Sequence, residues 1–128
     1  MISALEQFMS KVLVVDDSLT DRRVLSTYLT KAGMTVLDVE SAEEAMEKLG
    51  DYQPNLIVLD VVMGGKSGFE MCRSLKANAT TKPIPVILCS SKSTEADKMW
   101  GDVVGADAYI SKPVNREELL DKVQQLIN

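Results

Sequence analysis

The sequence predicts an α/β protein with a doubly wound, five-stranded parallel sheet in the strand order 2-1-3-4-5. Residues 56–59 are four consecutive large apolar residues that run straight into Asp60, and a run that is apolar on both faces is typical of a central parallel strand. Four more strand-like segments alternate with helical patterns, without a linker or a repeat. Strict alternation indicates right-handed crossovers, and the order 2-1-3-4-5 suits five strands.

The strands and helices have recognisable boundaries. The predicted strands cover residues 11–15, 35–39, 55–60, 86–89 and 108–111. Four of the helices between and after them begin at side chains that can cap a first turn, namely Ser18, Ser41, Ser93 or Thr94, and Asn115. In three of these helices an acidic residue three positions later completes a capping-box pattern, namely Asp21, Glu44 and Glu118. Glycines are expected to end three helices, namely Gly33, Gly50 and Gly105.

Length and composition indicate one soluble domain. We divide the 128 residues into an N-terminal extension, 1–10, with Ser3 and Glu6 as a candidate capping box, and a single domain, 11–128. The net charge of −5 argues against nucleic acid as a partner. No apolar run approaches the ~20 residues of a membrane span, and no secretory signal precedes Lys11, so a cytoplasmic location without membrane insertion is expected. Cys72 and Cys89 are expected to be buried free thiols.

Polar side chains stand at the carboxyl ends of four of the predicted strands. These residues are Asp16 and Asp17, Asp60, Ser90, and Lys112. The carboxyl ends of parallel strands meet at one edge of the sheet, where such folds bind ligands. Two carboxylates ~4 Å apart repel by about 4 kcal/mol at an effective dielectric constant of 20, so the cluster needs a cation. Oxygen ligands of this kind suit Mg²⁺.

A metal and a lysine beside a carboxylate are the parts that phosphoryl transfer to an aspartate requires. Asp60 is the candidate nucleophile because it ends the central strand. Asp16 and Asp17 would hold the metal, Lys112 would pair with the phosphoryl group, and the Ser90 hydroxyl would donate to a phosphoryl oxygen. With no histidine in the chain, histidine-based triads and histidine–zinc sites are excluded.

The motifs together resemble the receiver domain of two-component response regulators, of the chemotaxis-regulator type. The resemblance runs from Lys11 to the C-terminus, through residues 14–18, Leu59-Asp60 with Met63 and Gly68, residues 86–90, and Tyr109 with Lys112-Pro113. It implies a flavodoxin-like fold and phosphorylation of Asp60 by a histidine kinase, with a CheA-like kinase as one candidate. It also implies Mg²⁺ held by Asp17, Asp60 and the Val62 carbonyl, with Asp16 acting through water, and a cis peptide before Pro113. Residues 92–105 resemble the twitching-motility and phototaxis subgroup.

The resemblance implies a switch rather than an enzyme, one that catalyses only its own phosphorylation and dephosphorylation. We expect a stand-alone regulator that signals through a protein partner, in pilus-based motility or phototaxis. The family places that partner on the fourth helix, the last strand and the last helix, and Ser90 and Tyr109 would link phosphorylation to this face. Trp100 has two interpretations: packing on the sheet, which we favour, and partner binding, which makes it a candidate for the output face together with Tyr109. Gly101 in the same helix predicts a pliable element.

Two departures from the family pattern stand close to Asp60. Gly64 stands where proline is usual, which predicts a looser loop, and Val62 stands where a polar residue is frequent. Lys92 is expected to flank the phosphoryl group.

Three alternative functions are considered. An aspartyl-phosphate hydrolase of the haloacid-dehalogenase kind would need an aspartate at position 62. A flavodoxin-like electron carrier would bind a cofactor phosphate, which Asp16 and Asp17 would repel. The third alternative is a receiver that no longer accepts phosphate.

Overall fold

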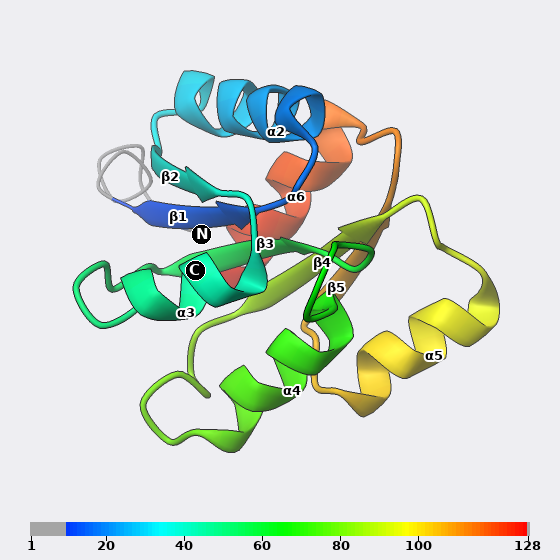
Figure 1. The fold of residues 1–128 in the computed structure, drawn as a ribbon. Helices are drawn as coiled ribbons and strands as arrows, with labels where there is room; N and C mark the ends of the chain where they lie inside the picture. Colours follow the sequence, from blue (N-terminus) through cyan, green and yellow to red (C-terminus); the bar gives the residue numbers. More distant parts are fainter. Residues whose placement is uncertain (1–9, 128) are drawn as a thin grey trace.

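The computed structural model describes residues 10–127, and the candidate capping box of Ser3 and Glu6 therefore lies outside the described residues. Five parallel strands form one sheet in the order β2-β1-β3-β4-β5, which confirms the predicted fold class and strand order (Figure 1). The strands are β1 (Lys11–Val15), β2 (Thr35–Val39), β3 (Leu56–Asp60), β4 (Val86–Ser90) and β5 (Ala108–Ser111). The central strand β3 is buried along its whole length, as its uninterrupted apolar run predicts.

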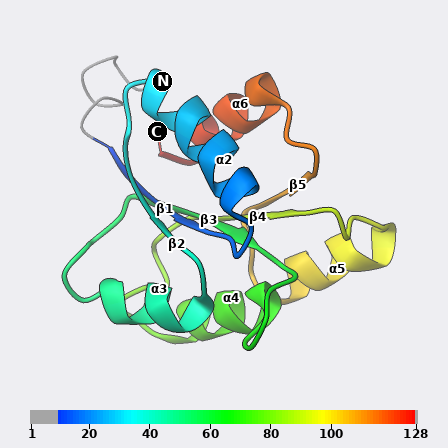
Figure 2. The ribbon, with the colours of Figure 1, turned by 45° about the horizontal axis from the view of Figure 1, so that its top comes forward.

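Helices cover both faces of the sheet. They are α2 (Leu19–Lys31), α3 (Ala42–Lys48), α4 (Gly68–Ala77), α5 (Glu95–Val103) and α6 (Arg116–Ile127). Figure 2 shows α2 and α6 on one face and α3, α4 and α5 on the other. Between residues 10 and 127, no helix has the length and apolarity needed to cross a bilayer. The strand order reverses direction at β1 and β3, and this switch point opens a crevice at the carboxyl ends of the strands.

Alternate residues of the buried strands feed two separate hydrophobic cores. In β1 and β3, Leu13 and Ile57 point to the α3–α4 side, whereas Val12 and Leu56 point to the α2–α6 side. Successive side chains of a strand point to opposite faces, so a strand covered on both sides must be apolar at every position. The apolar runs in the sequence are therefore the direct signature of the two cores.

The predicted helix starts are found, but one of the acidic partners has another use. The Ser18 hydroxyl accepts a hydrogen bond from the Asp21 N–H at 3.3 Å, as a cap should. The Asp21 carboxylate, however, does not return to Ser18; it accepts a hydrogen bond from Lys112 at 2.8 Å. A complete capping box forms at Thr94 and Asp97, which settles the choice between Ser93 and Thr94. One predicted capping acid has thus been recruited to the edge where the strands end.

The favoured expectation that Trp100 of α5 packs on the sheet was wrong. The Trp100 side chain is 52% exposed instead of packing on the sheet. Gly101 faces the sheet in its place, because a Cβ atom there would lie 2.9 Å from Cδ2 of the Tyr109 ring. The aromatic ring that fills the space under α5 therefore comes from β5, and the helix must present glycine to it.

Both cysteines are buried free thiols, as predicted. Burial raises the pKa of the Cys72 thiol to about 11 and that of Cys89 to about 12. Because the thiolate is the reactive form, both side chains act here as small apolar residues.

Candidate functional site

Three carboxylates converge where β1 and β3 end. Oxygen atoms of Asp16, Asp17 and Asp60 all lie within 4.8 Å of one another. Asp16 and Asp60 are buried, whereas Asp17 is exposed to solvent. Asp17 and Asp60 border a crevice of about 460 Å³, whose other lining residues are Ser18, Asp21, Val62, Ser91, Lys112 and Pro113. The sequence prediction that the strand-end acids gather at one edge is met in the structure.

Lys112 supplies the positive charge of the crevice. Its ammonium lies 2.8 Å from Asp16 Oδ2, 2.8 Å from Asp21 Oδ2 and 3.6 Å from Asp60 Oδ2. Burial acts to lower the pKa of Lys112, but hydrogen bonds to Asp16 and Asp21 raise it above its ordinary value overall. The peptide bond between Lys112 and Pro113 is cis. One permanently charged lysine thus faces a cluster with several negative charges.

The electrostatic imbalance is concentrated on Asp60. Burial, and after it the charge of Asp16, raises the pKa of the Asp60 carboxyl from 3.8 to about 6. Lys112 and the backbone N–H groups of Val62 and Val61 offset part of this rise. The Val62 N–H lies 3.4 Å from Asp60 Oδ1. At pH values above this pKa the Asp60 carboxylate is ionised, although its surroundings favour the neutral form. An added cation would reduce the free-energy cost of this ionisation.

Ser90 and Tyr109 meet at the loop that follows β4. Ser90 is buried, and its hydroxyl oxygen accepts a hydrogen bond from the Lys92 N–H at 3.1 Å. The Tyr109 hydroxyl donates to the Lys92 carbonyl oxygen. Burial raises the pKa of Tyr109, so the phenol is neutral and acts as a donor. The Lys92 ammonium pairs with Asp97 Oδ1 at 2.9 Å. Its expected place beside a phosphoryl group stays a prediction.

Comparison with known proteins identifies the family to which this arrangement belongs. A family model described as "response regulator receiver domain" matches residues 12–124. The chain belongs to this family. Receiver domains are phosphoacceptor switches that bind Mg²⁺ at an acidic pocket, and the structure has such a cluster of aspartates. The assignment selects the receiver over the hydrolase and electron-carrier alternatives.

Individual relatives agree with the family model. Protein PilG of Pseudomonas aeruginosa is 40% identical over 114 residues, which cover 89% of this chain and 84% of PilG. PilH of the same bacterium is 37% identical over 119 residues, which cover 93% and 98%. Among solved structures, chemotaxis protein CheY4 of Vibrio cholerae has a TM-score of 0.86 at 32% identity and covers 92% of this chain and 98% of its own. The BeF3-activated receiver domain of Klebsiella pneumoniae RstA has a TM-score of 0.85 at 25% identity, with coverage of 92% and 98%.

The donor set of this receiver fits a hard divalent cation. The three acidic residues offer only oxygen atoms, which are the ligands that Mg²⁺ prefers. Asp17 faces solvent, so an ion bound there could keep several of its waters, as Mg²⁺ usually does. Two of the carboxylates, Asp16 and Asp60, are buried. Burial and then the charge of Asp16 raise the pKa of Asp60, and a divalent cation held by the cluster would offset both effects.

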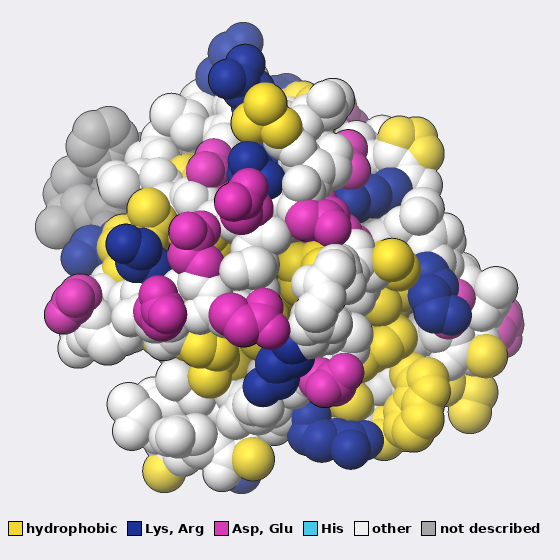
Figure 3. All heavy atoms as spheres, in the orientation of Figure 1, with side chains coloured by type: hydrophobic (Ala, Val, Ile, Leu, Met, Phe, Trp, Pro, Cys, Tyr) yellow, Lys and Arg dark blue, Asp and Glu magenta, His cyan; other side chains and the backbone are white. Residues whose placement is uncertain are grey.

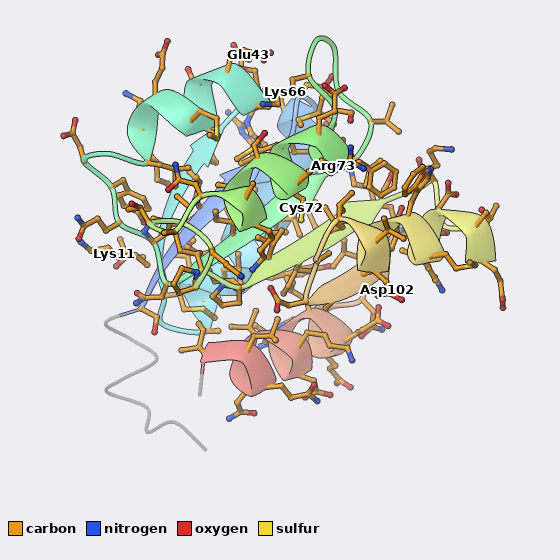
Figure 4. The ribbon with its side chains drawn as sticks, turned by 90° about the horizontal axis from the view of Figure 1, so that it is seen from below. Lys11, Glu43, Lys66, Cys72, Arg73 and Asp102 are labelled. Atoms are coloured by element: carbon orange, nitrogen blue, oxygen red, sulfur yellow. The ribbon has the colours of Figure 1, made fainter. Side chains whose placement is uncertain are left out.

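The departure at Gly64 has a visible consequence in this receiver. The Gly64 N–H donates to Asp17 Oδ2 at 3.3 Å, a bond that proline could not make. The next residues of the same loop are tied to α3, because the Lys66 N–H donates to Glu43 Oε2 at 3.3 Å (Figure 4). The loop after β3 therefore contacts both the acidic cluster and α3, and Gly64 adds a hydrogen-bond donor to the cluster.

Gly68 sets the distance between α4 and the end of β3. A Cβ atom at this position would lie 2.0 Å from the Asp60 carbonyl oxygen. The Gly68 N–H also donates to the Val61 carbonyl oxygen at 3.0 Å. No side chain larger than hydrogen fits without moving the strand end that carries Asp60, so this glycine fixes the backbone under the candidate acceptor.

Sequence reasoning missed three contributors to the receiver site. Asp21 binds Lys112, Ser91 lines the crevice, and Arg22 Nη1 donates to the Asp16 carbonyl oxygen at 2.7 Å. The only signal for Asp21 was its place three residues after Ser18, which equally describes a helix cap. Arg22 follows Asp21 and Ser91 follows Ser90, two residues that the sequence analysis did name. The directions in which the side chains of Arg22 and Ser91 point, however, depend on the surrounding fold.

Proposed function

We propose that this receiver domain accepts a phosphoryl group on Asp60 from a histidine kinase, with Mg²⁺, and passes the signal to a protein partner. The observation that carries the proposal is the surroundings of Asp60. Its carboxylate ends the central strand beside two more carboxylates, and the Lys112 ammonium lies 3.6 Å away. A buried carboxylate that faces a lysine in an open crevice is placed to attack an electrophilic phosphorus.

The transfer is an in-line displacement. An Asp60 oxygen forms a bond to phosphorus while the bond between phosphorus and the kinase histidine breaks, and the bonding electrons return to the imidazole nitrogen. Ionised Asp60 needs no general base, because a carboxylate carries no proton to remove. Lys112 would then turn from Asp60 to a phosphoryl oxygen, and the Ser90 hydroxyl would donate to another. Both interactions stabilise negative charge on the transferred group.

The metal assignments are those that the resemblance to receiver domains implies. Asp17 and Asp60 would bind Mg²⁺ directly, the Val62 carbonyl would add a backbone ligand, and Asp16 would act through water. Bound Mg²⁺ supplies positive charge to the carboxylates and to the phosphoryl oxygens. The convergence of the three acids within 4.8 Å supports this assignment.

Output would pass through Ser90 and Tyr109 to the face formed by α5, β5 and α6. The two residues share contacts with one backbone segment, since Lys92 bonds Ser90 through its N–H and Tyr109 through its carbonyl. A shift of the Ser90 hydroxyl toward a phosphoryl oxygen would disturb this segment and bias the position of Tyr109. The resemblance to the twitching-motility subgroup and the relatives PilG and PilH support an output in pilus-based motility or phototaxis.

Acetyl phosphate with Mg²⁺ tests the acceptor directly. Mass spectrometry of the treated protein should find one phosphoryl group, and peptide mapping should place it on Asp60. Asp60→Asn should remove it, and chelation of Mg²⁺ should remove it from the wild type. A phosphoryl group mapped to another residue, or labelling of Asp60→Asn to the same extent as the wild type, would contradict the assignment.

A further inference from the structure

The Lys112 ammonium is held more tightly by two other carboxylates than by the candidate acceptor. It lies 2.8 Å from Asp16 Oδ2 and 2.8 Å from Asp21 Oδ2, whereas Asp60 Oδ2 lies 3.6 Å away. Hydrogen bonds between an ammonium and a carboxylate are typically about 2.7 to 2.9 Å long, so only the first two contacts have the length of full hydrogen bonds. The donors of one ammonium are few, and these two bonds occupy most of them.

The two carboxylates that hold Lys112 differ in how firmly they are fixed. The Asp16 side chain is only 1% exposed, and its Oδ1 atom accepts a hydrogen bond from the Ser18 N–H at 2.9 Å. The Asp21 side chain is 42% exposed. Ser18 caps the Asp21 backbone N–H, which leaves the Asp21 carboxylate to its bond with Lys112. Water can replace an exposed ion pair more easily than a buried one, so Asp21 is the partner that Lys112 can exchange.

Asp21 stands where two hollows meet. It lines the crevice that contains Asp60, and it also lines an adjoining hollow of about 250 Å³. Lys112 and Pro113 line both hollows, and the remaining walls of the second are Val24, Leu25, Tyr28 and Val114. Figure 3 shows acidic side chains gathered on the face of the molecule below α2. In these acidic surroundings, the charge of Lys112 is the attraction that the crevice offers to an anionic phosphoryl donor, and Asp21 neutralises part of it.

We propose that Asp21 is a positioning residue that restrains Lys112 and thereby slows phosphoryl transfer to Asp60. This inference rests on the proposed function and adds a regulator to its site. In transfer from acetyl phosphate, an Asp60 oxygen forms a bond to phosphorus while the bond between phosphorus and the acetate oxygen breaks, and the electron pair leaves with acetate. Lys112 exchanges its bond to Asp21 for one to a phosphoryl oxygen, and water then solvates the Asp21 carboxylate.

Asp21→Asn removes the restraint with little change in shape. The asparagine keeps the backbone N–H that Ser18 caps, but it carries no charge to hold the ammonium. With acetyl phosphate and Mg²⁺, mass spectrometry should therefore show Asp21→Asn labelling on Asp60 about three to five times faster than the wild type. Asp21→Glu keeps the charge and should label at close to the wild-type rate. An Asp21 that only stabilised the start of α2 would lower the stability in urea without any gain in labelling rate.

Glu70→Gln is the matched control for the loss of one charge. Glu70 occupies the same helix position in α4, because its N–H is capped by the Ser67 hydroxyl at 3.2 Å. Its side chain lines a groove beside Trp100 instead of the crevice. Glu70→Gln should therefore label at the wild-type rate. A gain equal to that of Asp21→Asn would show that net charge alone sets the rate, and would overturn the proposal.

A double-mutant cycle with Lys112 separates restraint from direct repulsion of the donor. Lys112→Ala should itself label more slowly. In that background Asp21→Asn should have little further effect, because the restraint acts only through the lysine. Direct repulsion between the Asp21 carboxylate and an anionic donor would instead give the same gain in both backgrounds, and that result would overturn the proposal.

Exchange of the Lys112 ammonium protons with water tests the restraint without donor or metal. NMR of the ¹⁵N-labelled lysine side chain at low temperature, with a chelator present, should show severalfold faster exchange in Asp21→Asn than in the wild type or Glu70→Gln. Unchanged exchange would overturn the proposal. A wild type that labels on Asp60 beside an Asp21→Asn protein that labels no faster would also overturn it and leave the proposed function standing. A wild type that does not label would contradict the proposed function, and the role of Asp21 would fall with it.

Discussion

Replacing Asp60 by asparagine should stabilise the fold when Mg²⁺ is absent. The raised pKa of Asp60, about 6 against 3.8, means that the folded protein holds the ionised form less well than the unfolded chain does. That difference corresponds to about 3 kcal/mol at full ionisation. Asparagine has a similar shape and carries no charge. We therefore expect Asp60→Asn to raise the free energy of unfolding by about 1 to 3 kcal/mol near neutral pH, since the crevice admits water and relieves part of the cost.

The sign of the effect fixes its pH dependence. Below about pH 3 the carboxyl is protonated in the folded state and largely so in the unfolded chain, so Asp60 and asparagine should be nearly equivalent. As the pH rises toward 6, the unfolded chain ionises first and the wild type loses stability. Above about pH 7 both states are ionised and the difference between the two proteins reaches its plateau. The stabilisation by Asp60→Asn should thus grow between about pH 4 and pH 6 and change little beyond.

Urea denaturation of both proteins across this pH range, with a chelator present, measures the difference. Addition of Mg²⁺ should reverse the order, because a ligand that binds only the folded wild type adds RT ln(1 + [Mg²⁺]/Kd) to its stability. Asp51→Asn, at an exposed turn outside the cluster, is the matched control and should show neither effect. A stability difference that is independent of pH, or a less stable Asp60→Asn protein in chelator, would refute the electrostatic reasoning.

Three further predictions concern the same crevice. Asp17→Asn should weaken Mg²⁺ binding by at least about tenfold in calorimetric titration, because a direct ligand is lost; unchanged affinity would remove Asp17 from the metal site. Gly64→Pro deletes the N–H that holds Asp17 and should weaken Mg²⁺ binding about two- to threefold, whereas Gly64→Ala, whose Cβ would meet open space, should bind as the wild type does. Val62→Asn should speed loss of the phosphoryl group about tenfold, or about 1.4 kcal/mol in the barrier, by holding the attacking water; equal decay of the two phosphorylated proteins would exclude Val62 as a determinant of the hydrolysis rate.

The fold could be predicted from the sequence because its signals are local. A strand buried on both faces must be apolar throughout, and each strand of this kind ends in a polar residue that marks the edge of the sheet. The strand order then brings Asp16, Asp60 and Lys112 together without any knowledge of side-chain directions. Family resemblance added roles for these residues, and those roles stay predictions until phosphorylation and metal binding are measured.

The features that the sequence did not predict depend on direction. The spacing of Met99, Trp100 and Val103 is that of a buried face, and nothing in α5 itself indicates that the face points outward. The reason lies in β5, where the Tyr109 ring takes the space above the sheet and leaves room only for Gly101. The ion pair between Asp21 and Lys112 could not be predicted for the same reason. A capping pattern does not indicate which way the aspartate side chain turns when Lys112 lies nearby.

The reversed orientation of α5 also bears on how firmly each helix is held. Within Glu95–Val103 the buried residues are Asp97 and Gly101, whereas α4 buries Met71, Cys72 and Leu75. Each fully buried large apolar side chain contributes roughly 1.5 to 3 kcal/mol, and α5 lacks any between its ends. Its amide protons should therefore exchange through a local opening that costs far less than global unfolding. This loosely held helix also offers apolar side chains to another molecule, so binding there would close this opening and slow the exchange.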